Sequence, residues 1–562
     1  MKQTKQLKKP TLKQKEKAVH SPTGILSIFG TKEPRHFAIF MTTAFALLIA
    51  AGMFFHELWR DELEIYARIA LAHKILVEGD FTLIFYHSFL RLCMMIWNSE
   101  VMFQAAHFLI IVSAVFIFLK FAKIPPLQKF LFIFSYFIVY DYGIISRYYG
   151  FLILLLFIIV ILLTQKQPRY LLIVLLLLIL ANHTIQSTIF AASLSLYLIL
   201  DTTRRFLQKK VTINATFILA GVLFIAGWCA ILAAHYFITL KNTAYMGASE
   251  INPAPIFMNI KSVWNAFIPI PDPAPAASFW NTNIVNFPMI YYKGFNFQEV
   301  MTMPHYITFV ISLIIILIIS IKFSDKPMVL ITFLLSTIVY LVFLQMLKVY
   351  YLRYQGLLFI IFAYCWFLYA NAEDEEGLPF MNRIAQLFKN KAFAVLRRGF
   401  TPMLYIILLT QVYSAAYAFS KDMKYKFTLS QEAAGYISHN HLDKTHVMAG
   451  FFDYAAQTIA AHNKVKIYYP QVGHFNYYQE PYNTARKASM TVNDILLSCK
   501  KLRDSQDKDV LLILNFPMLV NDQELDRVAR ISTHVFITPI QSFTGTIIQE
   551  DEQFWLYEVF KK

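Results

Sequence analysis

Long apolar runs recur along this chain from residue 37 to residue 419. A helix needs about 20 mostly apolar residues to cross the hydrocarbon core of a bilayer. Hydrophobic residues make up 57% of the 562 residues and charged residues only 15%, which excludes an ordinary soluble globule. The sequence therefore predicts a polytopic α-helical membrane protein. We expect about eleven spans, near residues 37–57, 101–120, 126–140, 147–164, 169–182, 185–200, 212–238, 304–322, 327–346, 354–371 and 399–419.

The positions of the basic residues predict the topology. Residues 1–36 form a basic tail without apolar periodicity, and we place it in the cytoplasm near anionic lipid. The short loops that then face the cytoplasm are also basic, as the positive-inside rule requires. Their cations are Lys120, Lys123, Lys129, Lys166, Arg169, Arg204, Arg205, Lys209, Lys210, Lys322, Lys326, Lys389, Lys391, Arg397 and Arg398. The net charge of +16 thus reflects topology and membrane lipids rather than nucleic acid.

This topology divides the chain into a cytoplasmic tail (1–36), a transmembrane domain (37–419) with outer loops 59–100 and 240–303, and an extracytoplasmic region (420–562). The first span is too long for a signal-peptide core and lacks a cleavage site, so we expect it to stay as an anchor. That absence favours a bacterial inner membrane. Four scattered cysteines indicate neither a disulfide framework nor a zinc site.

The composition after Ser420 is that of a soluble protein. Helical and strand patterns alternate there, which predicts a small α/β domain. We expect helices at 430–440, 454–462, 492–502 and 523–531, and strands at 445–451, 465–469, 510–515 and 554–559. No glycine-rich phosphate loop and no serine elbow occurs in this region.

An acidic stretch follows the first span directly. Four acids fall within residues 57–64, where the chain leaves the bilayer, and keeping them there is costly unless they serve a function. From Asp61 onward the apolar positions predict an amphipathic helix along the interface. The alternative is that these acids only solvate a loop.

The predicted outer face collects the polar residues that are suited to transfer from a lipid-linked phosphate. Such a reaction needs a carboxylate that takes a proton from the attacking hydroxyl, and fixed cations that hold the phosphate. Arginine suits the second role because its planar fork matches phosphate oxygens. The candidates are Asp61, Glu62, Glu64, Arg68, His87, Arg91, Asp141, Arg147, Tyr148, Tyr149, Asn182, His183, Lys348, Tyr351, Arg353 and Tyr354. Each arginine is also explained as a snorkelling cation beside interfacial tyrosines, and His183 as a buried hydrogen-bonded histidine.

Three short motifs together resemble the GT-C glycosyltransferases, polytopic enzymes that use polyprenyl-phosphate sugars. The relatives in view are the protein O-mannosyltransferases and the lipid A aminoarabinose transferases. The motifs are Asp61-Glu62 followed by Tyr66-Ala67, Arg147-Tyr148-Tyr149, and Leu352-Arg353-Tyr354. Many bacterial relatives carry a His-Pro-Pro-like element, whereas residues 85–89 keep only the histidine, His87.

The resemblance implies inverting transfer of a sugar from a polyprenyl phosphate to a glycan, lipid or protein acceptor at the outer face. By resemblance Asp61 is the base, with Glu62 beside it. The residues implied to bind the donor and its phosphate are Arg147, Tyr148, Tyr149, His183, Lys348, Arg353, Tyr354 and His87. Some family members use a divalent cation and others do not, so Mg²⁺ or Mn²⁺ at the Asp61/Glu62 pair stays open.

Three rival functions remain. An O-antigen polymerase or ligase would place arginines in a large outer loop, and loop 240–303 contains none. A flippase or transporter of lipid-linked glycans predicts internal repeats and charges at the membrane midplane. A sensor or assembly protein would leave Asp61 and Arg147 replaceable without loss of function.

Overall fold

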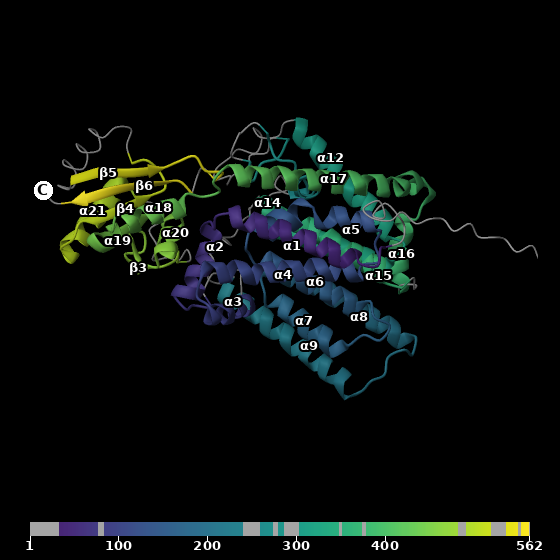
Figure 1. Cartoon of the computed structure of the whole chain (residues 1–562). Coiled ribbons are helices and arrows are strands. Elements are labelled where there is room, and N and C mark those ends of the chain that lie inside the picture. The colour runs from purple at the N-terminus through teal and green to yellow at the C-terminus, as the bar shows by residue number, and fades with distance from the viewer. Residues whose placement is uncertain are drawn as a thin grey trace, which may run out of the picture.

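The structure, a computed structural model, describes residues 33–76, 84–239, 259–273, 279–285, 303–347, 351–373, 378–480, 490–518, 536–548 and 552–560. Within these ranges a bundle of helices carries a six-stranded sheet at one end (Figure 1). Lys348, the helix predicted at 523–531 and much of loop 240–303 lie outside the described residues.

Eight helices of the described chain are long and apolar enough to cross a membrane. They are α1 (Phe37–Phe55), α4 (Glu100–Phe121), α8 (Ile185–Leu207), α9 (Ala215–Ala234) with its extension η4 (His235–Thr239), α12 (Met303–Phe323), α13 (Pro327–Leu347), α14 (Leu352–Gln355) with α15 (Leu357–Asn371), and α17 (Ala394–Lys424). Three shorter apolar helices are α3 (Ile84–Ile96), α6 (Tyr149–Leu163) and α7 (Tyr170–Ala181). The helical membrane architecture agrees with the sequence, and a total of eleven crossings stays a prediction.

The chain near the expected span 126–140 is not one continuous helix. Helix α5 (Pro126–Ile133) ends early, and η3 (Phe137–Ile144) follows as a π-helix. Two glycines permit this path. A Cβ on Gly143 would lie 2.4 Å from the carbonyl oxygen of Ile138, and one on Gly52 of α1 would lie 2.4 Å from the side chain of Ile144. η3 packs closely on α1, and the loop that follows it, residues 145–148, lies at the end of the bundle that carries the sheet.

The acidic stretch forms α2 (Arg60–Tyr66), which continues as the π-helix η2 (Ala67–Leu71). Its apolar residues Leu63, Ile65, Tyr66, Ile69 and Ala70 are buried, so the predicted helix exists. It is packed between the bundle and the sheet region, because α20 (Asp453–Asn463) lies against it. Three further helices of the described chain precede α17: α11 (Ser262–Phe267), α16 (Pro379–Phe388) and η8 (Lys391–Phe393).

The sheet follows the long helix α17 in the chain. Its strands are β1 (Val447–Phe451), β2 (Ile467–Tyr469), β3 (His474–Asn476), β4 (Val510–Leu514), β5 (Phe536–Phe543) and β6 (Phe554–Phe560), in the order β3-β2-β1-β4-β6-β5. Strand β1 is parallel to β2 and to β4, and β6 runs antiparallel to β4 and β5.

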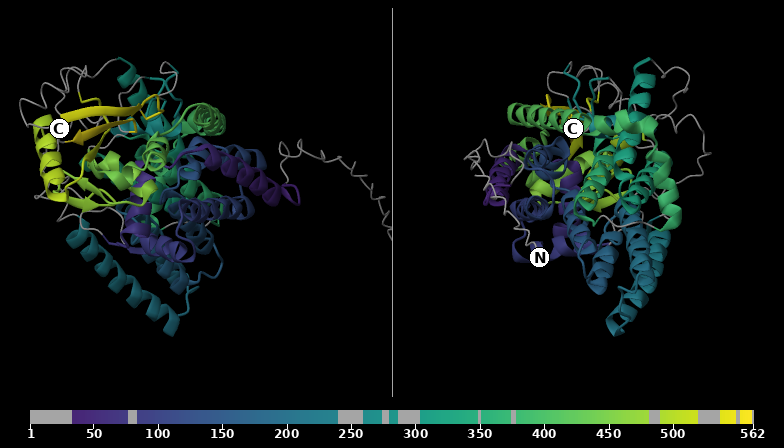
Figure 2. Two further views of the ribbon diagram at one scale, coloured as in Figure 1. Left: turned by 60° about the vertical axis from the view of Figure 1, so that its left-hand side comes forward. Right: turned by 90° about the vertical axis from the view of Figure 1, so that its right-hand side faces the viewer.

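Helices cover both faces of this sheet. In β1, Met448 packs toward α18 (Ser430–His439) and α20, whereas the next residue, Ala449, packs toward α21 (Val492–Gln506). This period-two alternation is what a strand buried on both faces requires. The short helix α19 (Leu442–Thr445) precedes β1. The sheet and its helices lie beside α2 (Figure 1), and Figure 2 shows the chain from two further directions.

Candidate functional site

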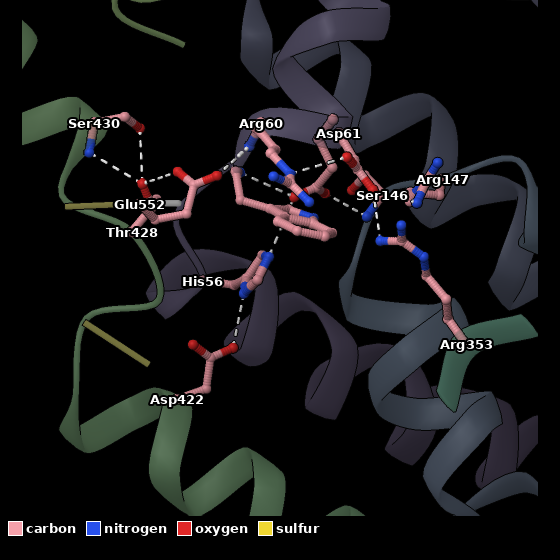
Figure 3. Close-up of polar contacts among 12 residues, drawn as sticks. His56, Arg60, Asp61, Ser146, Arg147, Arg353, Asp422, Thr428, Ser430 and Glu552 are labelled. Atoms are coloured by element: carbon pink, nitrogen blue, oxygen red, sulfur yellow. Dashed lines mark hydrogen bonds and ion pairs between the residues drawn. The ribbon is translucent and has the colours of Figure 1, made fainter. Parts of the chain in front are cut away.

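Asp61 lies at the start of α2, between arginines from distant parts of the chain. Its Oδ2 accepts hydrogen bonds from Nη1 of Arg147 at 2.7 Å and from Nη1 of Arg353 at 2.5 Å (Figure 3). Its Oδ1 lies 3.5 Å from Nε of Arg60. We call Asp61 with Arg147 and Arg353 the arginine clamp. The structure thus brings together the three residues that the three sequence motifs contributed.

Three positive charges hold the Asp61 carboxylate ionised. Burial by itself would raise its pKa, but the guanidinium groups of Arg353, Arg147 and Arg60 hold the pKa of this carboxyl well below its usual range. Two guanidinium groups pointing at one carboxylate oxygen also leave the clamp with excess positive charge. An anionic group such as a phosphate is therefore attracted to it.

Aromatic rings fix the two clamp arginines. The guanidinium carbon of Arg147 lies 5.2 Å from the ring centre of Tyr148 and 5.8 Å from that of Tyr149. The guanidinium carbon of Arg353 lies 5.2 Å from the ring centre of Tyr354. These cation–π contacts restrict each fork to one orientation. Arg147 and Arg353 therefore turn into the protein rather than outward as snorkelling cations.

Glu62 is fully buried and does not face the clamp as Asp61 does. Its Oε1 accepts a hydrogen bond from the backbone N–H of Ser146 at 2.5 Å. Its Oε2 accepts from the backbone N–H of Trp59 and from Nε2 of His56, both at 3.3 Å. Since Ser146 precedes Arg147, this carboxylate ties the loop that carries Arg147 to the helix that carries Asp61.

His56 balances the charge of Glu62 from the other side. Its Nδ1 donates to Oδ2 of Asp422 at 2.8 Å, so the imidazole lies between two carboxylates (Figure 3). Burial lowers the pKa of His56, but the charges and hydrogen bonds of Asp422 and Glu62 outweigh this effect and raise it to about 10. His56 is therefore a cation at neutral pH.

A second layer of hydrogen bonds supports the clamp from behind. Nε2 of His183 donates to the carbonyl oxygen of Tyr148 at 2.9 Å. Burial lowers the pKa of His183 to about 4, so this ring is neutral. The Tyr142 hydroxyl donates to the carbonyl oxygen of Arg353 at 2.6 Å, and that of Tyr340 to the carbonyl oxygen of Tyr354 at 2.8 Å. These contacts orient the clamp residues without touching Asp61.

His87, which the sequence also nominated, is placed with a different group. Its Nε2 accepts a hydrogen bond from Arg68 at 2.6 Å, and its Nδ1 donates to the carbonyl oxygen of Ile75 at 2.8 Å. These contacts anchor α3 to η2 beside the clamp. Lys348 lies outside the described residues, so its predicted phosphate contact stays a prediction.

The Asp61/Glu62 pair does not fit a divalent cation. The two carboxylates have different partners, and the arginines around Asp61 would repel a second positive ion. Among the residues that the structure describes, no group of three or more His, Cys, Asp or Glu side chains is arranged to hold a metal.

Sequence reasoning missed the residues that support the site from afar. Asp422 contacts His56 across 366 residues, and Glu552 contacts Arg60 across 492. Neither acid belongs to a motif, and both follow the last predicted span. His56 itself directly precedes the acidic stretch, and this position was the one sequence signal available.

Comparison with solved structures finds similar folds at low identity. The chain is similar to crystal structures of ArnT from Cupriavidus metallidurans, one bound to undecaprenyl phosphate and one in the apo state, each at 11% identity. These alignments cover 93% of this chain and 98% and 97% of the ArnT chains, with TM-scores of 0.41 and 0.40. A cryo-EM structure of the arabinofuranosyltransferase AftD from Mycobacteria matches at 11% identity over 94% of this chain and 40% of that chain, with a TM-score of 0.35.

ArnT and AftD are both enzymes of the GT-C superfamily. No protein-family model and no curated protein matches the sequence. At 11% identity and with TM-scores below 0.5, these likenesses carry no argument about chemistry. What the chain can do must be argued from its own side chains.

Proposed function

We propose that this protein is an integral membrane glycosyltransferase that moves a sugar from a polyprenyl-phosphate donor to an acceptor hydroxyl. The arginine clamp carries this proposal. It places one ionised carboxylate and two fixed arginines, Arg147 and Arg353, at a single point. These are the base and the phosphate-binding cations that such a transfer requires.

The donor phosphate competes with Asp61 for the clamp. As the phosphate accepts hydrogen bonds from Arg147 and Arg353, these arginines loosen their hold on the Asp61 carboxylate. The pKa of Asp61 then moves back toward its usual range, because the cations that depress it are shared with a second anion. Donor binding thereby makes Asp61 a stronger base at the moment when a base is needed.

The transfer itself is a single displacement. Asp61 takes the proton of the acceptor hydroxyl, and the acceptor oxygen forms a bond to the anomeric carbon of the sugar. The bond between that carbon and the phosphate oxygen breaks on the opposite face, so the configuration inverts. Polyprenyl phosphate leaves with one more negative charge, which Arg147 and Arg353 stabilise. The proton remains on Asp61 until solvent removes it.

The neighbouring residues have supporting roles in this proposal. Glu62 and His183 hold the backbone on either side of Arg147. The partly exposed ring of Tyr354 offers a flat face for the sugar, whereas the buried rings of Tyr148 and Tyr149 serve donor binding through their contacts with Arg147. We assign Lys348 and His87 to donor binding as well, because the family resemblance implies this role for them. Whether the transferred sugar is a hexose or a pentose is left to experiment.

The proposed setting is a bacterial inner membrane with about eleven spans. The amino terminus lies in the cytoplasm, and the sheet forms an extracytoplasmic α/β domain. Charged residues at one end of the bundle favour a transferase over a flippase, which needs its charges near the midplane. One similar structure holds undecaprenyl phosphate, a lipid of the proposed donor class.

A direct test incubates the purified protein in detergent with a panel of radiolabelled polyprenyl-phosphate sugars. We expect loss of label from the lipid with the wild type and none with Asp61→Asn. Asp201→Asn serves as the matched control, because Asp201 also pairs with two arginines but belongs to α8. Equal consumption by wild type and Asp61→Asn would remove Asp61 as the base. No consumption by the wild type across the panel would count against the donor class.

A further inference from the structure

Two buried carboxylates from the last spanning helix and the region after it reach back to the segment around Asp61. Asp422 lies near the end of α17, and Glu552 lies just before β6. Both side chains are buried, and both contact residues between His56 and Glu62 (Figure 3). Burying a carboxylate costs free energy unless the carboxylate is paired or hydrogen-bonded. The partners of Asp422 and Glu552 therefore explain how these two acids stay buried.

Glu552 holds the backbone at the first residue of α2. Its Oε1 accepts a hydrogen bond from the Arg60 N–H at 3.1 Å. Its Oε2 accepts from the Thr428 hydroxyl at 2.6 Å, and its carbonyl oxygen accepts from the Leu429 N–H at 3.1 Å. The carboxylate thus joins the start of α2 to the segment between α17 and α18. The N–H groups of a helix's first turn point out of the helix, and Glu552 accepts the hydrogen bond of this one.

The side chain of Arg60 is held from the same side. Its guanidinium carbon lies 5.2 Å from the ring centre of Tyr454 in α20 and 5.6 Å from that of Trp59. Its Nε is the group that lies 3.5 Å from Oδ1 of Asp61. The sheet region therefore contacts both the backbone and the side chain of the residue directly before Asp61.

Asp422 acts on the same segment through His56. The charged imidazole links Asp422 to Glu62, and Glu62 holds the Ser146 N–H beside Arg147. Asp422 and Glu552 therefore reach residues on both sides of Asp61. A seven-residue helix such as α2 is not stable by itself, so its position depends on contacts of this kind.

We propose that Glu552 is a positioning residue for Asp61, so that a side chain beyond the last spanning helix of the described chain is a working part of the transfer site. This inference rests on the proposed function. It predicts a division of labour. The donor phosphate is held by Arg147 and Arg353, which stand on other elements, whereas the alignment of the base depends on Glu552. Loss of Glu552 should then lower kcat and leave KM for the donor nearly unchanged.

The test compares Glu552→Ala, Glu552→Gln and the control Glu558→Gln in the full-length protein. Glu558 lies in β6, pairs with His446 and is partly exposed. We expect Glu552→Ala to lower kcat about 10- to 100-fold, since a displacement of about 1 Å costs roughly that factor. KM for the lipid donor should stay within about threefold. Glu552→Gln keeps an acceptor for the Arg60 N–H and should restore most of kcat, and Glu558→Gln should match the wild type.

Wild-type kcat in Glu552→Ala, or a raised donor KM with unchanged kcat, would overturn the proposal. If Glu552→Ala does not fold, Thr428→Val is the substitute, because it removes the hydroxyl that holds Oε2 of Glu552 and that also accepts from the Ser430 N–H. We expect it to lower kcat about three- to tenfold at constant KM. Unchanged kcat in that variant would overturn the proposal equally.

Amide hydrogen exchange separates this inference from the proposed function, because it requires no substrate. In Glu552→Ala, or in Thr428→Val if the alanine variant does not fold, we expect faster exchange across residues 60–66 and unchanged exchange in α8. Faster exchange at α2 in a protein that consumes no donor would leave the positioning role standing and remove the transferase. Unchanged exchange at α2 would remove the positioning role even if the wild type transfers sugar.

Discussion

The two ends of the helical bundle each carry an aspartate between two arginines. At the end beside the sheet, Asp61 pairs with Arg147 and Arg353 at 2.7 and 2.5 Å. Near the end of α8, Asp201 pairs with two arginines at 2.5 and 2.6 Å. Burial does not distinguish them, since the aspartates are 15% and 4% exposed and all four arginines 8–12%. Their chemistry differs because of where the arginines come from.

The Asp201 cluster is local. Arg204 and Arg205 stand three and four residues further along α8, so the helix itself brings them to the aspartate. Arg205 also donates to the carbonyl oxygens of Gln165 and Lys166, which fastens the α6–α7 connection. The guanidinium group of Arg205 therefore bonds both to Asp201 and to the α6–α7 connection, so the cluster is explained as a contact that holds helices together.

The Asp61 cluster is assembled by the fold. Its arginines come from 86 and 292 residues away, and the fold brings their like charges together in a buried place. Such an assembly costs free energy that a membrane protein avoids unless the charges serve a purpose. The N–O distances in the two clusters are alike. What distinguishes the candidate site is that its arginines come from distant parts of the chain, whereas those of Asp201 come from the same helix.

The largest expected effect is the loss of the carboxylate. Asp61→Asn should reduce sugar transfer about 100- to 10,000-fold, the contribution of a general base. Asp201→Asn should leave transfer within about twofold, because no step of the proposed reaction uses it. Initial rates of donor consumption measure both. Equal losses in the two variants would mean that both clusters are structural joints.

The next effect concerns the shape of the cation. Arg353→Lys replaces a planar fork with a point charge and should lower transfer about 10- to 100-fold. Arg205→Lys should change it less than about twofold, and a thermal unfolding scan should register it instead. A clamp that accepts lysine at position 353 without loss would show that charge alone holds the donor.

Alkaline pH should loosen only one of the two ends. Folding raises the pKa of His56 from 6.5 to about 10. A group with a raised pKa contributes stability below its unfolded pKa and loses it as the pH rises through the folded value. Exchange at α2, corrected for the intrinsic rate, should therefore increase between pH 6.5 and about 10, whereas exchange near Asp201 should not. A parallel increase at both ends would contradict the charged state of His56.

The smallest effect is expected behind the clamp. Tyr142→Phe leaves the Arg353 carbonyl without the hydroxyl that bonds it and should cost about 1 kcal/mol of stability, with a loss of transfer of about threefold. Tyr197→Phe, near Asp201, should leave transfer unchanged. Chemical denaturation measures the free energy of unfolding, and initial rates of donor consumption measure transfer. A transfer rate unchanged by Tyr142→Phe would show that Arg353 does not depend on this layer.

The sequence predicted this architecture to a useful extent. Apolar runs predict the long helices, because a helix needs an uninterrupted apolar length to cross a bilayer. Alternating helix and strand patterns predicted most elements of the sheet region. The motifs pointed to Asp61, Arg147 and Arg353. Charged residues at the ends of membrane spans cost free energy, so they are candidates for a functional role. The break between α5 and η3 was not predicted, because it depends on how closely Gly52 of α1 lets η3 approach.

The supporting contacts were beyond sequence reasoning. Glu62 accepts hydrogen bonds from the backbone N–H groups of Ser146 and Trp59, and no sequence pattern pointed to the contact with Ser146. Asp422 and Glu552 look like surface acids, because nothing in a local pattern tells which residue hundreds of positions earlier will meet them. Long-range pairing depends on the tertiary path, and a single sequence does not record that path.

The attachment of Glu552 to α2 also has a consequence for biogenesis. A ribosome reaches Glu552 only after every spanning helix of the described chain has been made. In the proposed arrangement, a nascent chain therefore inserts its clamp arginines before Glu552 aligns the base, and transfer stays slow until then. A premature stop codon between residues 424 and 552 would yield a membrane-inserted chain that lacks this alignment. Such a chain would occupy the insertion machinery while consuming donor lipid only slowly.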